Sequence, residues 1–285
     1  MSDTADGLPT LSELIRTHGL SARKSLSQNF ILDLNLTRRI ARAAGSLEDV
    51  TVVEVGAGPG GLTRALLLEG AGKVIAVERD ERCLPILEQI KQKYPDRIDI
   101  ISGDALELDL GKLAPSPARI VANLPYGAST ELLIHWLSTE PWPPWYDRMV
   151  LMFQREVAER IVSEPNTKSY GRLSVFAQWR TTPRIVLSLP PRAFTPAPKV
   201  DSSLVEFVPI AEPQPAGSRA TLEKVVAAAF GQRRKMLRQS LKKMMLNPEN
   251  VLEIVGIDPT LRAEALSVSQ FCALSYEWHK HLIDQ

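Results

Sequence analysis

The stretch VVEVGAGPGGLT, residues 52–63, decides the fold of this chain. An apolar strand that ends near Glu54 runs into a glycine-rich turn, and a helix follows. Side chains are absent where the backbone turns sharply and where a ligand would approach the main chain, at Gly56, Gly58, Gly60 and Gly61. This spacing fits the dinucleotide fingerprint, but alone it does not separate a nicotinamide cofactor from other adenosine-containing ligands.

Short apolar runs alternate with segments of helical length around this turn. The runs that read as strands, between about residues 50 and 160, are VTVVEVG, KVIAVE, IDIIS, RIVAN and RMVLMF. This alternation predicts an α/β fold with a parallel sheet and helices on its faces. After Pro183, RIVLSLP and SSLVEFVPI flank the segment PRAFTPAPKVD and are expected to end the sheet as a strand pair.

The length allows one sizeable α/β domain and a smaller one. We expect a ligand-binding domain over residues 1–210, in which residues 1–48 form a helical and basic N-terminal segment. AEPQPAGS, residues 211–218, reads as a linker. Residues 219–285 predict a small helical domain.

Composition excludes several protein classes. Of the 285 residues, 44% are hydrophobic and 24% charged, and no apolar run approaches the roughly 18 residues of a membrane-spanning helix. The start MSDTADGLPT carries acids where a signal peptide carries basic residues, which predicts a cytoplasmic protein. Cys83 and Cys272 lack metal-ligand spacing, so we expect buried free thiols and no metal site.

The net charge is only +1, but the basic side chains are unevenly placed. GQRRKMLRQSLKK, residues 231–243, holds six basic side chains and no acidic one, and a second basic cluster lies near the N-terminus. Local charge can hold a polyanion whatever the total charge is, although a solvated helix face explains either cluster equally well. The candidates for phosphate contacts are Arg23, Lys24, Arg233, Arg234, Lys235 and Arg238.

Acidic residues follow the next two predicted strands. Glu78 stands 22 residues after Gly56, where a carboxylate can accept hydrogen bonds from both hydroxyls of a ribose. Asp104, in GDAL, is placed to accept from an adenine amino group while an apolar neighbour packs on the ring. A helix cap is the alternative role for Asp104.

The stretch IVANLPYGAST, residues 120–130, puts a polar turn at the mouth of the fourth strand. The 6-amino group of adenine is a poor nucleophile because its lone pair is delocalised into the ring. Acceptance of both amine hydrogens, by the Asn123 side-chain oxygen and the Leu124 carbonyl, favours a pyramidal nitrogen that can attack. Pro125 fixes the turn, and Tyr126 can stack on a base swung out of its strand.

NLPY, SLSQNFI, EVGAGPGGLT, GDAL and FTPAPKVDSSLVEF together resemble the ribosomal RNA adenine dimethyltransferase family, from about Ser25 through Val208. FGQRRKMLRQSL resembles its small-subunit branch. The resemblance implies a Rossmann-like seven-stranded methyltransferase sheet and S-adenosyl-L-methionine as cofactor. It implies dimethylation of two adjacent adenines near the 3′ end of small-subunit (16S) rRNA, on an immature small ribosomal subunit. A monomer is the default expectation.

The resemblance also assigns cofactor contacts. They are Gln28, Asn29, Ile31, Gly56, Gly58, Glu78, Arg79, Asp104, Ala105 and Asn123. The family usually has leucine where Ile31 stands, and a β-branched residue in the Gly127-Ala128 position, so the wall below the target base is less filled here. Phe194 is the candidate for a second stacking surface, and a core phenylalanine is the alternative.

Other interpretations stay open. A nicotinamide dehydrogenase explains the glycine turn and Glu78 but not NLPY. Methyltransferases of DNA adenine or protein glutamine favour a second proline where Leu124 stands. The large-subunit rRNA methyltransferases that confer antibiotic resistance share QNF and differ mainly in the C-terminal segment. An RNA-docking assembly factor without chemistry is a further class, against which the intact Asn123 and Tyr126 argue.

Overall fold

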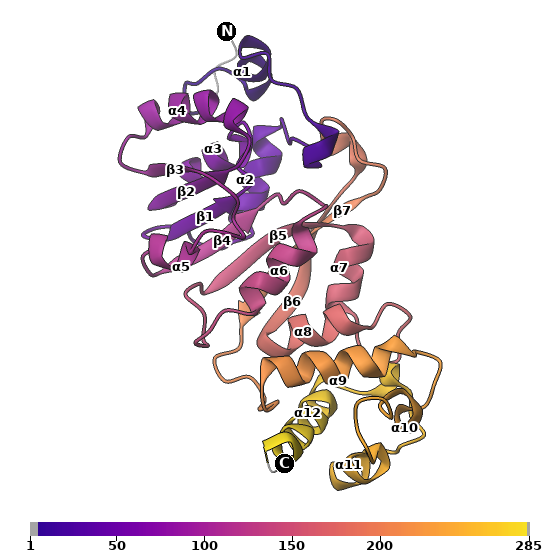
Figure 1. Ribbon diagram of the computed structural model, residues 1–285. Helices are drawn as coiled ribbons and strands as arrows, with labels where there is room; N and C mark the ends of the chain where they lie inside the picture. Colours follow the sequence, from indigo (N-terminus) through magenta and orange to yellow (C-terminus); the bar gives the residue numbers. More distant parts are fainter. Residues whose placement is uncertain (1–4, 284–285) are drawn as a thin grey trace. The chain divides into compact units, whose positions relative to one another are not determined.

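The computed structural model describes residues 5–283, except for the side chain of Lys24. The chain forms two compact units (Figure 1). The first contains the residues up to Ala158 together with Arg184–Pro209, and the second contains Glu159–Pro183 and the residues from Ile210 onward. This division differs from the predicted boundary, because residues 159–183 group with the C-terminal helices.

A seven-stranded sheet has the order β3-β2-β1-β4-β5-β7-β6. Its strands are β1 (Thr51–Val55), β2 (Lys73–Glu78), β3 (Ile98–Ser102), β4 (Ala118–Ala122), β5 (Arg148–Gln154), β6 (Thr181–Leu189) and β7 (Ser202–Pro209). β1 to β5 pair in parallel, and β7 runs antiparallel to β5. The order changes direction between β1 and β4, where open α/β sheets bind their ligands. The predicted α/β sheet is therefore confirmed.

Helices cover the sheet of the first unit. They are α1 (Leu11–Thr17), α2 (Leu34–Arg42), α3 (Gly61–Leu68), α4 (Leu84–Lys93), α5 (Leu110–Leu113) and α6 (Ser129–Leu137), and α7 (Arg155–Val162) follows β5. β1 is buried along its whole length, as a parallel strand covered on both faces should be. Val52, Val74 and Val121 join the apolar residues of α2 and α3 in one core. α2 and α3 pack side by side (Figure 1).

β6 begins at Thr181, three residues before the expected strand run RIVLSLP, which starts after Pro183. It is the last strand of the sheet. Proline is tolerated in an edge strand because one side of such a strand needs no ladder hydrogen bonds. The expected strand pair at the end of the sheet is confirmed, and Pro183 lies within its edge strand.

The second unit is helical, as the sequence predicted for its C-terminal part. Its helices are α8 (Arg172–Arg180), α9 (Arg219–Gly231), α10 (Leu237–Ser240), α11 (Pro248–Ile254) and α12 (Val268–Ile283). Tyr170 and Trp179 belong to one core with residues of α9 and α12, which explains why residues 159–183 group here. The segment 211–218 also packs, since the carbonyl of Gln214 accepts from Trp179 Nε1 at 2.9 Å.

The basic run 231–243 lies in the part of the chain that was expected to be helical, but it is helical only in part. α9 ends at Gly231, and α10 holds only Leu237–Ser240, so most of the basic side chains lie in turns. Both cysteines are free and buried, as expected. Within residues 5–283, no helix is long and apolar enough to cross a membrane.

Candidate functional site

A cavity of about 310 Å³ opens in the first unit at the carboxyl ends of β1, β2, β3 and β4. The glycine turn, the NLPY turn and the N-terminal segment 25–31 complete its walls. The structure brings together here nearly every predicted ligand contact: Gln28, Asn29, Ile31, Gly56, Gly58, Glu78, Arg79, Asp104, Ala105, Asn123, Leu124, Pro125 and Tyr126.

The glycine turn is packed too closely for side chains. Gly56 and Gly58 have φ values of 73° and 55°, in the region that favours glycine. A Cβ atom on Gly58 would lie 3.3 Å from Cε1 of Phe30, and one on Gly61 would lie 2.9 Å from the Ile31 carbonyl oxygen. The turn therefore presents bare main chain to the cavity.

Glu78 ends β2 and turns its carboxylate toward this main chain. Its Oε2 accepts from the Gly58 N–H at 2.7 Å, and its Oε1 accepts from the Asp80 N–H at 2.8 Å. Burial raises the pKa of Glu78, and the backbone donors oppose the shift. Each oxygen keeps one further lone-pair direction, so the carboxylate can still accept from two ribose hydroxyls.

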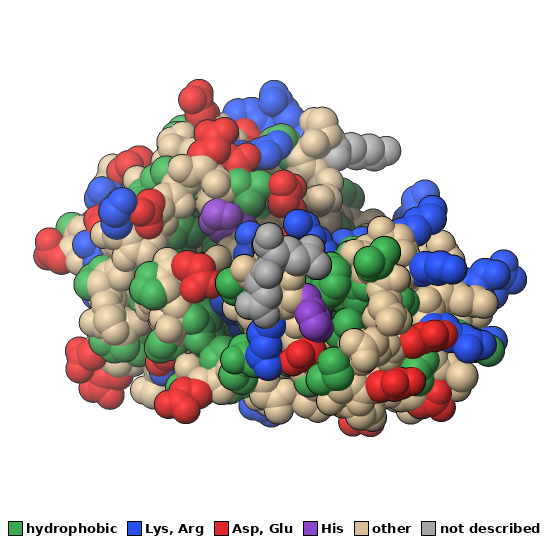
Figure 2. Space-filling model, turned by 60° about the horizontal axis from the view of Figure 1, so that its bottom comes forward, with side chains coloured by type: hydrophobic (Ala, Val, Ile, Leu, Met, Phe, Trp, Pro, Cys, Tyr) green, Lys and Arg blue, Asp and Glu red, His purple; other side chains and the backbone are tan. Residues whose placement is uncertain are grey.

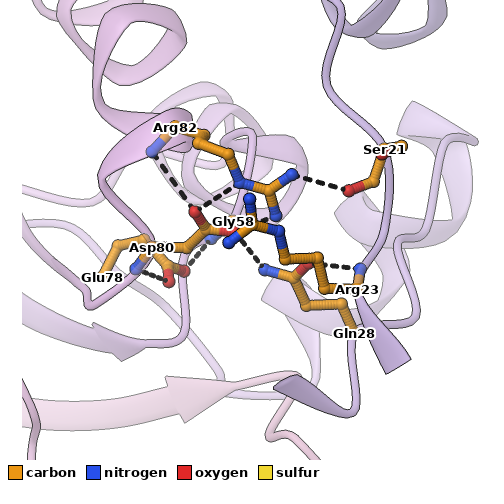
Figure 3. A network of polar contacts seen from close by, with 7 residues as sticks. All are labelled: Ser21, Arg23, Gln28, Gly58, Glu78, Asp80 and Arg82. Carbon is orange, nitrogen blue, oxygen red and sulfur yellow. Dashed lines mark hydrogen bonds and ion pairs between the residues drawn. The ribbon is translucent and has the colours of Figure 1, made fainter. Parts of the chain in front are cut away.

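Asp80 joins this carboxylate to the N-terminal segment (Figure 3). Its Oδ2 accepts from Gln28 Nε2 at 2.8 Å and from Arg82 Nη2 at 2.6 Å. The Arg82 guanidinium lowers the pKa of Asp80 to about 2. The sequence analysis missed Asp80, although its place two residues after the predicted ribose acceptor was a signal.

Glu54 was a second residue that the sequence analysis left without a role. It is 1% exposed, borders the cavity and accepts from the Thr63 hydroxyl at 2.5 Å. Burial raises the pKa of Glu54 to about 8, with the Thr63 hydroxyl opposing the shift and the Glu78 carboxylate adding to it. Glu54 is therefore a neutral hydrogen-bonding group at neutral pH.

Asp104 lies where the third strand ends, as predicted, with Ala105 buried beside it. Its Oδ1 accepts from the Leu106 N–H at 3.1 Å, so it caps a turn, while the nearest helix starts later, at Leu110. Arg79 Nη1 lies 3.4 Å from its Oδ2. Asp104 therefore caps a turn rather than a helix, so the alternative role of a helix cap is wrong in detail. Its other carboxylate oxygen, Oδ2, forms a long ion pair with Arg79.

Asn123 follows β4, and its amide orientation is set by one hydrogen bond. Its Nδ2 donates to the Asn29 carbonyl at 3.0 Å, which leaves Oδ1 as the acceptor atom of the amide. Within the described part of the chain, neither Oδ1 nor the Leu124 carbonyl accepts a hydrogen bond. Two adjacent acceptors of the NLPY turn are thus available to a ligand that carries two N–H donors.

Tyr126 is held at its hydroxyl, which lies 2.6 Å from Ser202 Oγ of β7. Burial raises the pKa of Tyr126, so the phenol is neutral. Pro125 packs beside the glycine turn, since a Cβ atom on Gly56 would lie 3.4 Å from its Cδ. The anchored ring forms part of the cavity wall and can serve as a flat surface for a base.

A family model described as ribosomal RNA adenine dimethylase matches residues 19–280. The chain belongs to this dimethylase family. Ribosomal RNA small subunit methyltransferase A of Rhodopseudomonas palustris (strain TIE-1) is 61% identical over 273 residues, which cover 95% of each chain. The protein of the same name from Ruegeria sp. (strain TM1040) is 58% identical and covers 96% of this chain and 98% of its own.

Solved structures share the fold of this dimethylase family member. A dimethyladenosine transferase from Plasmodium falciparum has a TM-score of 0.69 at 23% identity and covers 85% of this chain and 95% of its own. The 23S rRNA methyltransferase ErmE has a TM-score of 0.65 at 26% identity and covers 90% of this chain and 100% of its own. The predicted methyltransferase sheet is confirmed, and membership of the dimethylase family excludes the nicotinamide dehydrogenase.

Phe194 does not lie at the cavity of this dimethylase family member. It is 3% exposed and belongs to the core of the first unit. The neighbouring Thr195 exchanges two backbone hydrogen bonds with Phe30, which ties this segment to the N-terminal one. The core alternative describes the observed position, and the second stacking surface stays a prediction.

The basic residues predicted to contact phosphates differ in their exposure and in their ion pairs. Arg23 is exposed, whereas the side chain of Lys24 lies outside the described residues. In the second unit, Arg233 pairs with Glu264 at 2.8 Å and also donates to the Lys168 carbonyl, so it has a structural role. Arg234 and Lys235 are exposed and form no ion pair with a described residue, and Arg238 lies 3.6 Å from Glu249. Figure 2 shows Lys and Arg side chains gathered toward one edge of the face drawn.

Proposed function

We propose that this enzyme transfers methyl groups from S-adenosylmethionine to the 6-amino groups of two adjacent adenines near the 3′ end of small-subunit rRNA. The observation that carries the adenine chemistry is the pair of available acceptors on Asn123 and Leu124. An amine that donates both hydrogens to them is held with its lone pair directed away from the pair. The lone pair of the adenine 6-amino nitrogen can then attack the methyl group of an adenosine-type cofactor bound across the cavity.

The residues on the other side fit the proposed cofactor. The bare main chain at Gly56 and Gly58 admits a close ligand, and Glu78 retains acceptor capacity for two hydroxyls. Asp104 and Ala105 offer an acceptor and an apolar surface for an adenine ring. Asn29 and Ile31 would border the methionine end. When bound, the cofactor supplies an electrophilic methyl group on a positively charged sulfur.

The chain's own contribution is positioning. Asn123 and Leu124 hold the amine, and Tyr126 offers a ring on which the flipped base can stack. Such orientation can lower a barrier by about 7–11 kcal/mol in the best model systems. A strong base is not needed, because the methylated amine is acidic enough to release its proton afterwards. In the second transfer the methylated 6-amino nitrogen carries one hydrogen, which it donates to one of the same two acceptors.

The small-subunit target rests on the relatives. Proteins named small subunit methyltransferase A are 58–61% identical across nearly the whole chain, including the C-terminal helices. The large-subunit enzyme shares the fold at 26% identity. The exposed Arg234 and Lys235 of the second unit would contact rRNA phosphates. The immature small subunit as substrate, the cytoplasmic location and the monomer are parts of the same proposal.

The test offers unmethylated small subunits, large-subunit rRNA and DNA in parallel, with labelled S-adenosylmethionine, followed by digestion to nucleosides. We expect labelled dimethyladenosine from the small subunit alone. Label in the large-subunit RNA would move the protein to the resistance branch. Cofactor binding without transfer to any of the three would favour the assembly factor. Naked 16S rRNA as a fourth substrate separates free RNA from an assembled particle.

A further inference from the structure

Asp80 occupies a junction between two walls of the cavity without lining the cavity itself. Its side chain is 4% exposed and accepts hydrogen bonds from two residues. Arg82 donates from Nε to Oδ1 at 2.9 Å and from Nη2 to Oδ2, and Gln28 donates from Nε2 to Oδ2. Its own N–H donates to Glu78. One residue therefore contacts both the predicted ribose acceptor and the N-terminal wall.

Gln28 is fixed at both ends of its side-chain amide. Nε2 donates to Asp80, and Oε1 accepts from the Arg23 N–H at 2.9 Å (Figure 3). The same segment is tied by Arg82 to the Ser21 carbonyl at 3.2 Å, and by Asn123 to the Asn29 carbonyl. Three of these four ties involve Asp80 or its partners Arg82 and Gln28.

Removal of the Asp80 carboxylate would leave both partners unmatched. Gln28 Nε2 would lose its acceptor, and the Arg82 guanidinium would lose the anion that aligns it toward Ser21. Loss of a hydrogen bond to a charged group is among the costlier single changes in a protein. Among the described residues, the hydrogen bonds that tie the wall segment 21–31 to the rest of the chain would then be those of Asn123 and Thr195, beside the packing of Phe30 and Ile31.

We propose that Asp80 is a positioning residue that holds Glu78 and the wall segment 21–31 in one arrangement, so that cofactor affinity depends on a residue outside the cavity. This inference rests on the proposed cofactor site. Asp80 acts through Glu78 and Gln28 and touches no ligand. The carboxylate stays charged across the working pH range, because its pKa lies near 2.

The test exchanges the amide and the carboxylate that form the hydrogen bond between Gln28 and Asp80. Asp80→Asn places an amide against the Gln28 amide, Gln28→Glu places a carboxylate against Asp80, and the double variant restores one donor and one acceptor. The control is Asp147→Asn, which removes an aspartate partner of Arg119, at 2.8 Å, in the same unit, at a position more exposed than Asp80. Binding of S-adenosylmethionine is measured by calorimetry, and trypsin cleavage after Arg23 and Lys24 reports the order of the segment.

We expect Asp80→Asn to raise the Kd at least about tenfold, which corresponds to 1.4 kcal/mol, and to speed cleavage at Arg23. The double variant should recover part of both losses, because it restores the hydrogen bond between side chains 80 and 28 but not the carboxylate that aligns Arg82, and the control should change neither. Equal affinity and cleavage in Asp80→Asn and wild type would overturn the inference. A double variant as weak as the worse single one would also overturn it. Wild-type protein that binds no cofactor would instead contradict the proposed function.

Discussion

On the proposed cofactor side of the cavity, Glu78 accepts from two backbone N–H groups and keeps lone pairs for a ligand, and behind it Asp80 accepts from Arg82 and Gln28. On the target side, Asn123 Oδ1 and the Leu124 carbonyl accept no hydrogen bond from the described part of the chain. The cofactor side is therefore ordered by the chain itself, whereas the target side has capacity that a substrate fills. Changes on the two sides should accordingly damage different steps.

The largest effect should follow the loss of the target-side acceptor. We expect Asn123→Ala to lower kcat by roughly 100- to 1,000-fold, as removal of one preorganised polar contact does in other enzymes. Cofactor affinity should fall much less, since Glu78 and the glycine turn are untouched. Asn35→Ala, at an exposed position of α2, is the matched control. Undiminished turnover by Asn123→Ala would exclude the proposed role.

A change on the cofactor side should appear in binding instead. Glu78→Gln turns one acceptor into a donor, so the new amide opposes either the Gly58 or the Asp80 N–H. We expect the Kd of S-adenosylmethionine to rise about 10- to 100-fold, or about 1.4–2.8 kcal/mol, with a smaller change in kcat. Glu81→Gln, three residues later in the chain and exposed, is the control for the loss of one negative charge. An unchanged Kd would show that Glu78 is not the ribose acceptor.

The sequence predicted the cofactor side better than the polar contacts that hold it. The glycine turn and the strand-end acids are local signals, because parallel strands bring their carboxyl ends to one edge. Asp80 and Gln28 are 52 positions apart, and no local pattern predicts that they meet. The helical interpretation of residues 231–243 was only partly right: α9 ends at Gly231, and the backbone N–H groups of Leu237 and Arg238 donate to the carbonyls of Leu261 and Pro259, which no local pattern predicts.

The position of Phe194 decides whether the proposed target side has one aromatic wall or two. From its burial in the core, we expect Phe194→Ala to destabilise the protein by about 3–5 kcal/mol. Turnover per folded molecule, measured well below the melting temperature, should change little. A loss of kcat with full cofactor binding would instead support the stacking role, and it would imply that the ring leaves the core when RNA binds.

The proposed function also includes a phosphate-contacting surface on the second unit. The double charge reversal of Arg234 and Lys235 to Glu should weaken RNA binding and leave S-adenosylmethionine binding intact. Each lost phosphate contact should reduce the slope of log K against log salt by about 0.7–0.9. Arg233 is left unchanged because its ion pair with Glu264 stabilises the second unit. Lys93→Glu, exposed on the first unit, is the control, and equal RNA affinities would refute this surface.

The smallest effect concerns Glu54, the one carboxyl of the cofactor side that should be neutral. Its pKa of about 8 in the folded protein exceeds the ordinary value of 4.5, so the folded state keeps a proton that the unfolded chain releases. Stability should therefore fall as the pH rises between about 4.5 and about 8. Glu54→Gln imitates the protonated form and still accepts from Thr63, so its melting temperature should drop less between pH 6 and pH 8.5 than that of wild type. Glu48→Gln, an exposed control, should follow wild type. If the melting temperatures of Glu54→Gln and wild type depended on pH in the same way, Glu54 would be ionised in the folded protein, and its carboxylate would add a negative charge beside Glu78.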